Sequence, residues 1–335
     1  MGIVASRTIA GMSESSSAPP APHPSPGADL HVIVAGAHVA ASATLPRLPA
    51  LRRLMGLMSL SSQVFADDKG LATPLELTRA RALGLTAPPG HIPWAAVESR
   101  QPDSPCAWIT LCHWQVAADH ALLHDPAHLD IDDATSRALH AAAAPYFLED
   151  GIELVYHRAD AWLAKGELFR NLPTRSLGKV VHQLITPDIF EAATPAGVVL
   201  RRLQNEMQML FYTHPVNDER QSRGLRPINS YWVHGAGVWS GVDLSATRLQ
   251  METGLKQVAK GQAGAGTQEP GAAWSTLDQE VIAPLVPRIQ AGERIDLSFC
   301  GERQAITYRG ARPGMLSRVQ QALGWQPALP AFDQL

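Results

Sequence analysis

The stretch that most constrains the fold spans residues 200–237, because it contains the chain's clearest succession of helix, turn and strand. Pro215 ends a first helix, and Asn217 is placed to cap a second, short helix that ends at Gly224. Residues 228–233 are predicted to form a strand, and residues 234–237 a tight turn after it. The first helix has one apolar face at helical spacing, formed by Leu200, Leu203, Met207, Leu210 and Phe211.

Polar side chains on the opposite face of that helix and in the following segments converge on the end of the predicted strand. Because ligands of α/β proteins gather at strand ends, we predict a ligand site here. Arg220 is a natural partner for a carboxylate or phosphate, so the expected partner is a small anionic metabolite, or otherwise a regulatory protein. The predicted ligand-binding residues are Glu206, Gln208, His214, Asn217, Arg220, Asn229 and His234.

A structural role is the alternative for several of these residues. His214, Asn217 and Asn229 can cap and tie the junction between the helices and the strand without binding any ligand. Arg220 can form a surface salt bridge with Asp218 or another neighbour. The sequence leaves both interpretations open.

Composition excludes several classes of protein. The chain has 335 residues, 45% of them hydrophobic, which is enough for two domains or one large domain. Its formal net charge of -3 offers no basic excess for nucleic acid. No apolar run approaches the roughly 18 residues of a membrane span, so no membrane partner is expected. The three cysteines are too scattered for a disulfide framework, which favours a cytoplasmic location.

The domain organisation follows from shifts in pattern along the chain. Residues 1–28 are rich in Ser, Pro and Ala and are predicted to be a disordered tail. Residues 30–35 are predicted to be a buried strand that opens a core α/β domain formed by 29–105 and 200–335. Residues 106–199 mix short strands and helices, which predicts an inserted or accessory α+β lobe.

A cluster of His and Asp residues provides an alternative site. His113, Asp119, His120 and His124 could bind a divalent metal, Zn or Mn. Such a site would make the chain a metal-dependent phosphomutase or phosphohydrolase of unusual design. The same residues are also explained by a strand, an Asp-Pro turn, and Asp132 or Asp133 capping the next helix, and this second interpretation is favoured.

Two segments, NEMQMLFYTHPVN (205–217) and RPINSYWVHGAG (226–237), resemble the bacterial RpfE-type regulatory proteins. These proteins are similar to the archaeal type of cofactor-independent phosphoglycerate mutase. The resemblance extends over residues 30–325 and implies the fold of the alkaline phosphatase superfamily, a mixed α/β sheet flanked by helices with an inserted lobe. The positions that match the mutase pattern are His214, Pro215, Asn217, Arg220, Gly224, Asn229, Gly235 and Gly237.

The chain departs from the metal-dependent members of that superfamily. Their first strand ends in Asp-Gly, and further Asp and His ligands lie near the C-terminus, because a two-metal site needs several such ligands. Here Ala35-Gly36-Ala37-His38 follows the first strand, and no histidine follows residue 240. The sequence therefore predicts a pseudoenzyme without cofactor or identified catalytic residues, which keeps the ancestral crevice for binding a ligand or partner.

Overall fold

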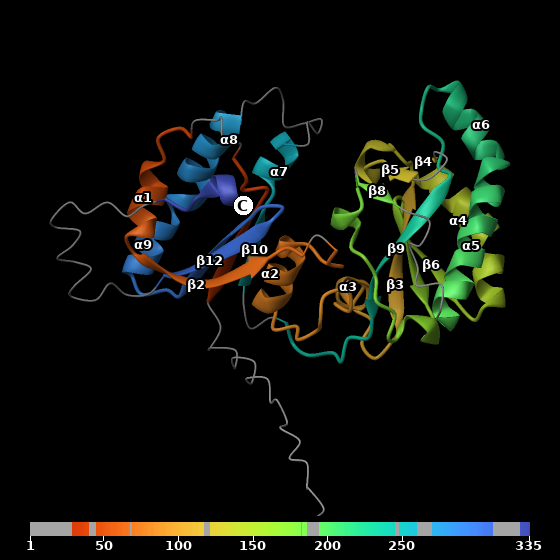
Figure 1. Ribbon diagram of the computed structural model, residues 1–335, viewed down its shortest axis with the longest axis horizontal. Coiled ribbons are helices and arrows are strands. Elements are labelled where there is room, and N and C mark those ends of the chain that lie inside the picture. The colour runs from red at the N-terminus through yellow and green to blue at the C-terminus, as the bar shows by residue number, and fades with distance from the viewer. Residues whose placement is uncertain are drawn as a thin grey trace, which may run out of the picture.

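The computed structural model describes residues 29–39, 45–67, 69–116, 121–181, 183–185, 194–244, 248–259, 270–310 and 329–335. The predicted tail at 1–28 lies outside this range. The described elements form two lobes, each with its own sheet and its own hydrophobic cluster (Figure 1). The helices are short to medium in length, and none of those described is long and apolar enough to cross a membrane.

The first lobe contains a mixed sheet with strand order β10-β1-β11-β12-β2. Its parallel part comprises β10 (Arg248–Glu252), β1 (Leu30–Ala35) and β11 (Ile295–Cys300). An antiparallel part follows, made of β12 (Gln304–Gly310) and β2 (Met58–Phe65). Every residue of β1 is buried, which confirms the buried strand predicted at 30–35. A mixed sheet flanked by helices confirms the predicted α/β class.

Helices cover both faces of this sheet (Figure 1). Val32 and Val34 of β1 pack in one cluster with α1 (Pro49–Met55), α8 (Pro270–Thr276) and α9 (Leu285–Gln290). The same cluster includes residues of α7 (Gly254–Ala259) and of a π-helix, η4 (Leu277–Ile282). Ile33 points to the other face, where α2 (Pro74–Ala82) packs. Phe332, in the 3-10 turn η5 (Phe332–Gln334), packs in the first cluster as well.

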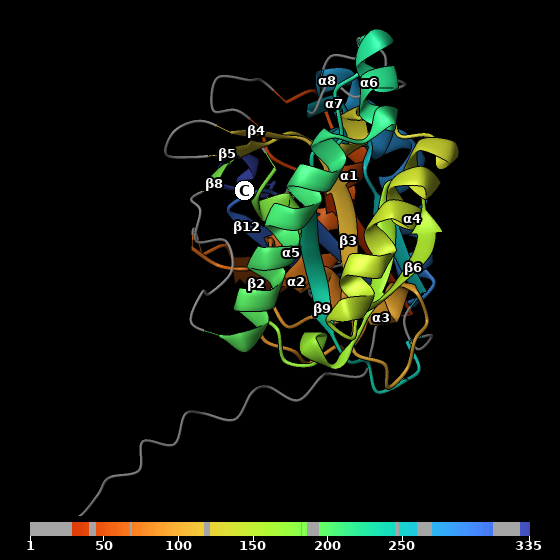
Figure 2. The ribbon, with the colours of Figure 1, turned by 90° about the vertical axis from the view of Figure 1, so that its right-hand side faces the viewer.

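The second lobe is built on an antiparallel sheet with strand order β6-β7-β3-β9. Its strands are β3 (Cys106–Cys112), β6 (Glu153–Arg158), β7 (Ala161–Lys165) and β9 (Ser230–Gly237). The long helices α4 (Asp133–Glu149) and α5 (Pro195–Tyr212) lie side by side over one face (Figure 2). The short helix α3 (Trp94–Glu98) covers the other face.

Smaller elements complete this lobe. A three-stranded sheet contains β4 (Trp114–Val116), β5 (Ala121–Leu123) and β8 (Leu184–Ile185). Helix α6 (Pro215–Ser222) follows α5. Three 3-10 turns lie in the connections: η1 (Pro126–His128), η2 (Glu167–Phe169) and η3 (Leu177–Lys179).

The structure confirms the predicted helix over the first part of the 200–237 stretch and corrects the rest. Leu200, Leu203, Met207 and Phe211 are all buried on one face of α5. The N-cap of α6 is His214 rather than Asn217, which lies inside the helix. The predicted turn at 234–237 is wrong, because β9 continues to Gly237.

Gly235 and Gly237 do not form a turn; they allow residues 93 and 94, at the start of α3, to pack closely against β9. A Cβ added at Gly235 would lie 3.0 Å from the Cβ of Trp94, at the start of α3.

The pairing of β9 determines which lobe contains this stretch. β9 pairs with β3, and α5 packs in the same cluster as β3 and α4. Residues 200–237, expected in the core domain, therefore pack with residues 106–199 in the second lobe. The alternation of residues in a strand indicates which of its faces is buried, but it does not indicate which distant strand will pair with it. The pairing of β9 with β3 could therefore not be predicted from residues 200–237 alone.

Candidate functional site

Asn217 and Asn229 use their side-chain amides to hold the main chain. Asn217 Nδ2 donates to the carbonyl oxygens of Phe211 and Ile228, both at 2.7 Å, and its Oδ1 accepts from Ile228 N at 2.7 Å. Asn229 Oδ1 accepts from Trp114 N at 2.7 Å, and its Nδ2 donates to Trp114 O at 2.8 Å. These contacts match the structural role that the sequence left open for the two residues.

Arg220 is buried, with 1% of its surface exposed, rather than placed in a surface salt bridge. Its Nε donates to Arg226 O at 3.0 Å, Nη1 donates to Asp130 O at 3.2 Å, and Nη2 donates to Leu129 O. Burial lowers the pKa of Arg220. The guanidinium thus ties α6 to two loops, and its three nitrogens all bind carbonyls of the chain.

The other predicted residues are spread over both faces of the second sheet. Glu206 lies on α5, where its Oε1 accepts from Arg202 Nη1 at 2.8 Å. Gln208 lies on the same helix and is partly exposed. His214 Nδ1 accepts from Val216 N at 3.3 Å as the cap of α6.

His234 lies on the α3 side of the sheet, because its neighbour Val233 points into the cluster under α5. Its Nε2 is a hydrogen-bond partner of Thr110 Oγ1 at 2.8 Å, and burial lowers its pKa to about 4. The sheet therefore separates His234 from Glu206, and the seven predicted residues do not surround one crevice. A ligand role for any one of them stays a prediction.

The structure brings two members of the alternative metal cluster together. The rings of His113 and His124 have centroids 5.2 Å apart. His113 Nδ1 is hydrogen-bonded to Pro227 O at 2.9 Å. Asp119 and His120 lie outside the described residues, so a Zn or Mn site there stays a prediction. The turn-and-cap interpretation is confirmed for Asp132, whose Oδ1 accepts from Thr135 N at 2.7 Å at the start of α4.

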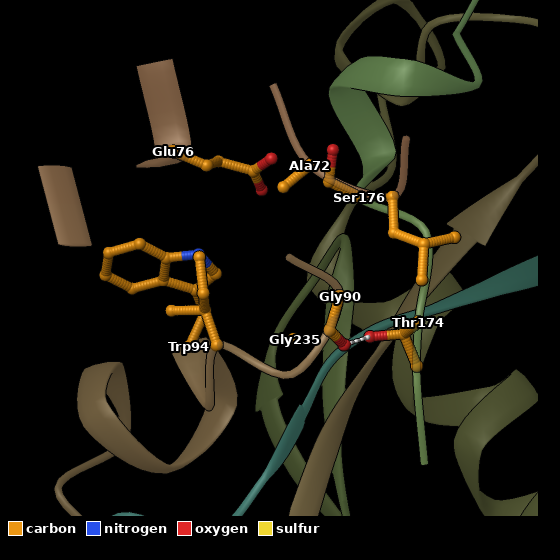
Figure 3. A pocket seen from close by; sticks show the side chains of 9 residues that line it. Ala72, Glu76, Gly90, Trp94, Thr174, Ser176 and Gly235 are labelled. Atoms are coloured by element: carbon orange, nitrogen blue, oxygen red, sulfur yellow. Dashed lines mark hydrogen bonds between the residues drawn. The ribbon is translucent and has the colours of Figure 1, made fainter. Parts of the chain in front are cut away.

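A small crevice lies where the two lobes meet, beside the end of β9 (Figure 3). Glu76 of α2, Trp94 of α3, Ser176 and Gly235 line it. Trp94 Nε1 and Ser176 Oγ are buried and have no hydrogen-bond partner among the described residues. The free volume is about 10 Å³, which is room for about one water molecule. This crevice is too small for a metabolite.

A much larger cavity, of about 280 Å³, lies in the first lobe at the carboxyl ends of the parallel strands. Val34 of β1 and Glu252 of β10 are register partners near those ends, and both line the cavity. The remaining walls come from α7, α8 and the π-helix η4. Open α/β sheets bind their ligands at this edge, so we take this strand-end cavity as the candidate functional site.

The π-helix is a second feature that distinguishes this cavity. π-helical turns are rare and occur frequently at functional sites. Leu277, Glu280 and Val281 of η4 line the cavity. Asp278 of η4 is buried, and its carboxylate accepts from Ala50 N at 3.1 Å and Leu51 N at 2.7 Å, at the start of α1. The turn is therefore anchored by α1 while it presents Glu280 to the cavity.

The lining of the cavity favours ligands that donate hydrogen bonds or carry positive charge. Glu252 and Glu280 are its charged side chains, and both are acidic. Gln257 and Thr276 add an amide and a hydroxyl. Carboxylates accept hydrogen bonds and attract cations, so amine and hydroxyl groups suit this site better than phosphate does.

Gly36 allows α7 to approach the end of β1. It has a φ of 73°, and an added Cβ would lie 2.6 Å from Lys256 Cα in α7. We expect Gly36→Ala to displace α7, to lower the free energy of unfolding by more than about 2 kcal/mol, and to disturb the cavity wall. Denaturant titration measures this loss.

Gly84→Ala is the matched control for that substitution. Gly84 has a similar φ of 71°, but an added Cβ would meet no atom within 4 Å. We expect it to cost only backbone strain, about 1 kcal/mol. Equal losses for the two variants would show that contact between α7 and β1 is not what requires a glycine at position 36.

The residues that line the strand-end cavity were not among those that the sequence singled out. The alternation of Leu249 and Met251 with polar residues is the signal that could have located β10. No local pattern shows that this short strand lies parallel to β1, more than 200 residues earlier. The π-helix likewise has no signature in its sequence that would separate it from an α-helix.

Comparison with known proteins leaves the family open. No protein-family model matches the chain, and no curated protein matches it. Among solved structures, the chain is similar to a cofactor-independent phosphoglycerate mutase from Thermoplasma acidophilum, with a TM-score of 0.35 and 10% identity over 86% of this chain and 91% of that one. It is also similar to the PH0037 protein from Pyrococcus horikoshii, with a TM-score of 0.43 and 9% identity over 85% of this chain and 88% of that one. Both TM-scores are below the level that marks a shared fold, so they establish neither a family nor an activity.

Proposed function

We propose that this chain is a non-catalytic regulatory protein of the RpfE type that acts by binding a small molecule in the strand-end cavity. The resemblance of residues 205–217 and 226–237 to that type supports its descent from a phosphoglycerate-mutase-like ancestor of the alkaline phosphatase superfamily. The observation that carries the binding role is the cavity of about 280 Å³ at the carboxyl ends of β1 and β10.

The proposed ligand is a small amine or amino alcohol rather than an anion. The cavity volume is near the lower end of the range for ligand pockets, so the ligand is small. Glu252 and Glu280 would repel a phosphate or carboxylate group and attract an ammonium group. An anionic metabolite was the ligand expected from Arg220, but the three guanidinium nitrogens of that residue bind main-chain carbonyls.

A thermal-shift series tests this function. We expect putrescine or ethanolamine to raise the melting temperature of the protein, because a ligand that binds only the folded state stabilises it. We expect 3-phosphoglycerate to leave the melting temperature unchanged. Glu280→Gln removes one negative charge from the cavity. We expect it to raise the dissociation constant of the amine about tenfold, which is the effect of losing one charge-assisted hydrogen bond.

Glu153→Gln is the control, because Glu153 is an exposed carboxylate on β6 of the other lobe. We expect this variant to bind the amine as the unmodified chain does. A response to 3-phosphoglycerate alone, unchanged by Glu280→Gln, would rule out the cavity as the site. Conversion of 3-phosphoglycerate to 2-phosphoglycerate by the purified protein with added Mn²⁺ would rule out the non-catalytic role.

A further inference from the structure

The strand β2 forms one end of the first lobe's sheet. It pairs with β12 on one side, and no described strand pairs with its other side (Figure 1). Its eight residues, MSLSSQVF, include no charged residue and no proline. An end strand presents unpaired N–H and C=O groups, which another strand can bind. The free side of β2 is therefore chemically able to accept a further strand.

Two other end strands, β10 and β6, carry charges that hinder such pairing. β10, at the opposite end of the same sheet, contains Arg248 and Glu252. β6, at one end of the second sheet, contains Glu153 and Arg158. Charged side chains are a common protection of sheet edges, because pairing would bury them. β2 lacks this protection and instead exposes large apolar side chains.

Leu60 and Phe65 are the exposed apolar side chains of β2, with 57% and 67% of their surfaces accessible. Phe65 is the register partner of Gln304, and Leu60 is the partner of Tyr308. The register shifts between Thr307 and Tyr308, so Ser61 is an extra residue in β2. Because of this bulge, Leu60, Gln63 and Phe65 stand on the same face of the sheet.

This arrangement is self-complementary under two-fold symmetry. In an antiparallel pair of β2 strands related by a two-fold axis at Gln63, Gln63 faces Gln63 and Ser62 faces Val64. Because Ser61 is the extra residue of the bulge, the next pair is Leu60 of one copy opposite Phe65 of the other. Each exposed apolar side chain then faces another apolar side chain on the same face. The strand carries no charge, so pairing with itself brings no like charges together.

We propose that the chain forms a two-fold dimer in which β2 of one copy pairs antiparallel with β2 of the other. The sheets of the two first lobes then form one continuous sheet. We assign this edge to a second copy of the chain, because pairing two identical β2 strands is what brings Leu60 of one strand opposite Phe65 of the other. The strand-end cavity lies at β1 and β10, on the other side of the sheet's strand order, so the dimer leaves it open. The proposal is independent of the ligand.

Sedimentation equilibrium on the full chain tests the dimer. We expect the unmodified chain to be a dimer at micromolar concentration. Phe65→Lys and Leu60→Lys should each raise the dimer dissociation constant by at least about 100-fold, because each change removes two symmetric apolar contacts and adds two charges to the junction. Met209→Lys is the control, because Met209 is an equally exposed residue on α5, with 68% of its surface accessible. It should leave the dimer intact.

Disulfide trapping tests the register directly. Residues opposite each other in an antiparallel pair have Cα atoms about 4.5–5.5 Å apart, within reach of a disulfide. We expect Gln63→Cys to form a covalent dimer under mild oxidation and Met209→Cys to stay monomeric on a non-reducing gel. The native Cys106, Cys112 and Cys300 are buried and give no background. A monomeric unmodified chain, or a dimer that neither Phe65→Lys weakens nor Gln63→Cys traps, would overturn the proposal.

Discussion

Replacing Arg220 with methionine lowers the free energy of unfolding by about 2–4 kcal/mol, because the buried side chain then loses three charge-assisted hydrogen bonds to main-chain carbonyls. These carbonyls belong to Leu129, Asp130 and Arg226. Asp130 has a φ of 46°, a left-handed conformation that is costly for a non-glycine residue, and the bond from Arg220 helps to hold it. Urea denaturation followed by circular dichroism measures the loss.

Arg223→Met provides the comparison for that experiment. Arg223 is the C-cap residue of the helix that contains Arg220, but 55% of its side chain is exposed, and its Nη1 lies 3.8 Å from Asp132 Oδ2. An exposed pair of this kind contributes less than about 1 kcal/mol. Similar losses for Arg220→Met and Arg223→Met would mean that the buried guanidinium is not what stabilises this junction.

The contrast between α5 and Arg220 shows what local sequence can predict. The spacing of apolar residues in α5 depends only on the helical repeat, so the buried face of that helix follows from the sequence. The partners of Arg220 lie in loops at 129–130 and 226, and the first of these is about 90 residues away. An arginine that binds an anion and one that binds carbonyls have the same local sequence, so its role required the structure.

Stability should also fall as the solution is acidified from about pH 6.5 to pH 4. Burial lowers the pKa of His234 from 6.5 to about 4, so the unfolded chain takes up a proton at this residue before the folded chain does. The stabilisation is fully present above pH 6.5 and is lost as the pH falls toward 4. The difference between these two pKa values corresponds to at most about 3 kcal/mol of stability. Burial lowers the pKa of His31 as well, which acts in the same direction.

His234→Gln separates this effect from general acid denaturation. Glutamine can keep a hydrogen bond to Thr110 Oγ1 but has no group that titrates in this range. We expect the variant to lose less stability between pH 6.5 and 4 than the unmodified chain, as measured by urea titrations at each pH. The exposed His128→Gln is the control and should follow the unmodified chain. An unchanged slope in His234→Gln would contradict the assigned cause.

The candidate site was the least predictable part of the molecule. The sequence identifies β1 as a buried strand of an α/β sheet, but the polar residues of the chain predict the ligand site at the end of the strand at 228–233 instead. The walls of the cavity come from β10, α7, α8 and the π-helix, all more than 200 residues further along the chain. Their assembly depends on parallel pairing and long-range packing, which local periodicity does not encode.

A crystal structure of the protein grown with putrescine tests the central claim most directly. The account predicts one ligand in the strand-end cavity, with an ammonium group within hydrogen-bond distance of the carboxylate of Glu252 or Glu280. Putrescine bound at another position, with the strand-end cavity empty, would contradict it.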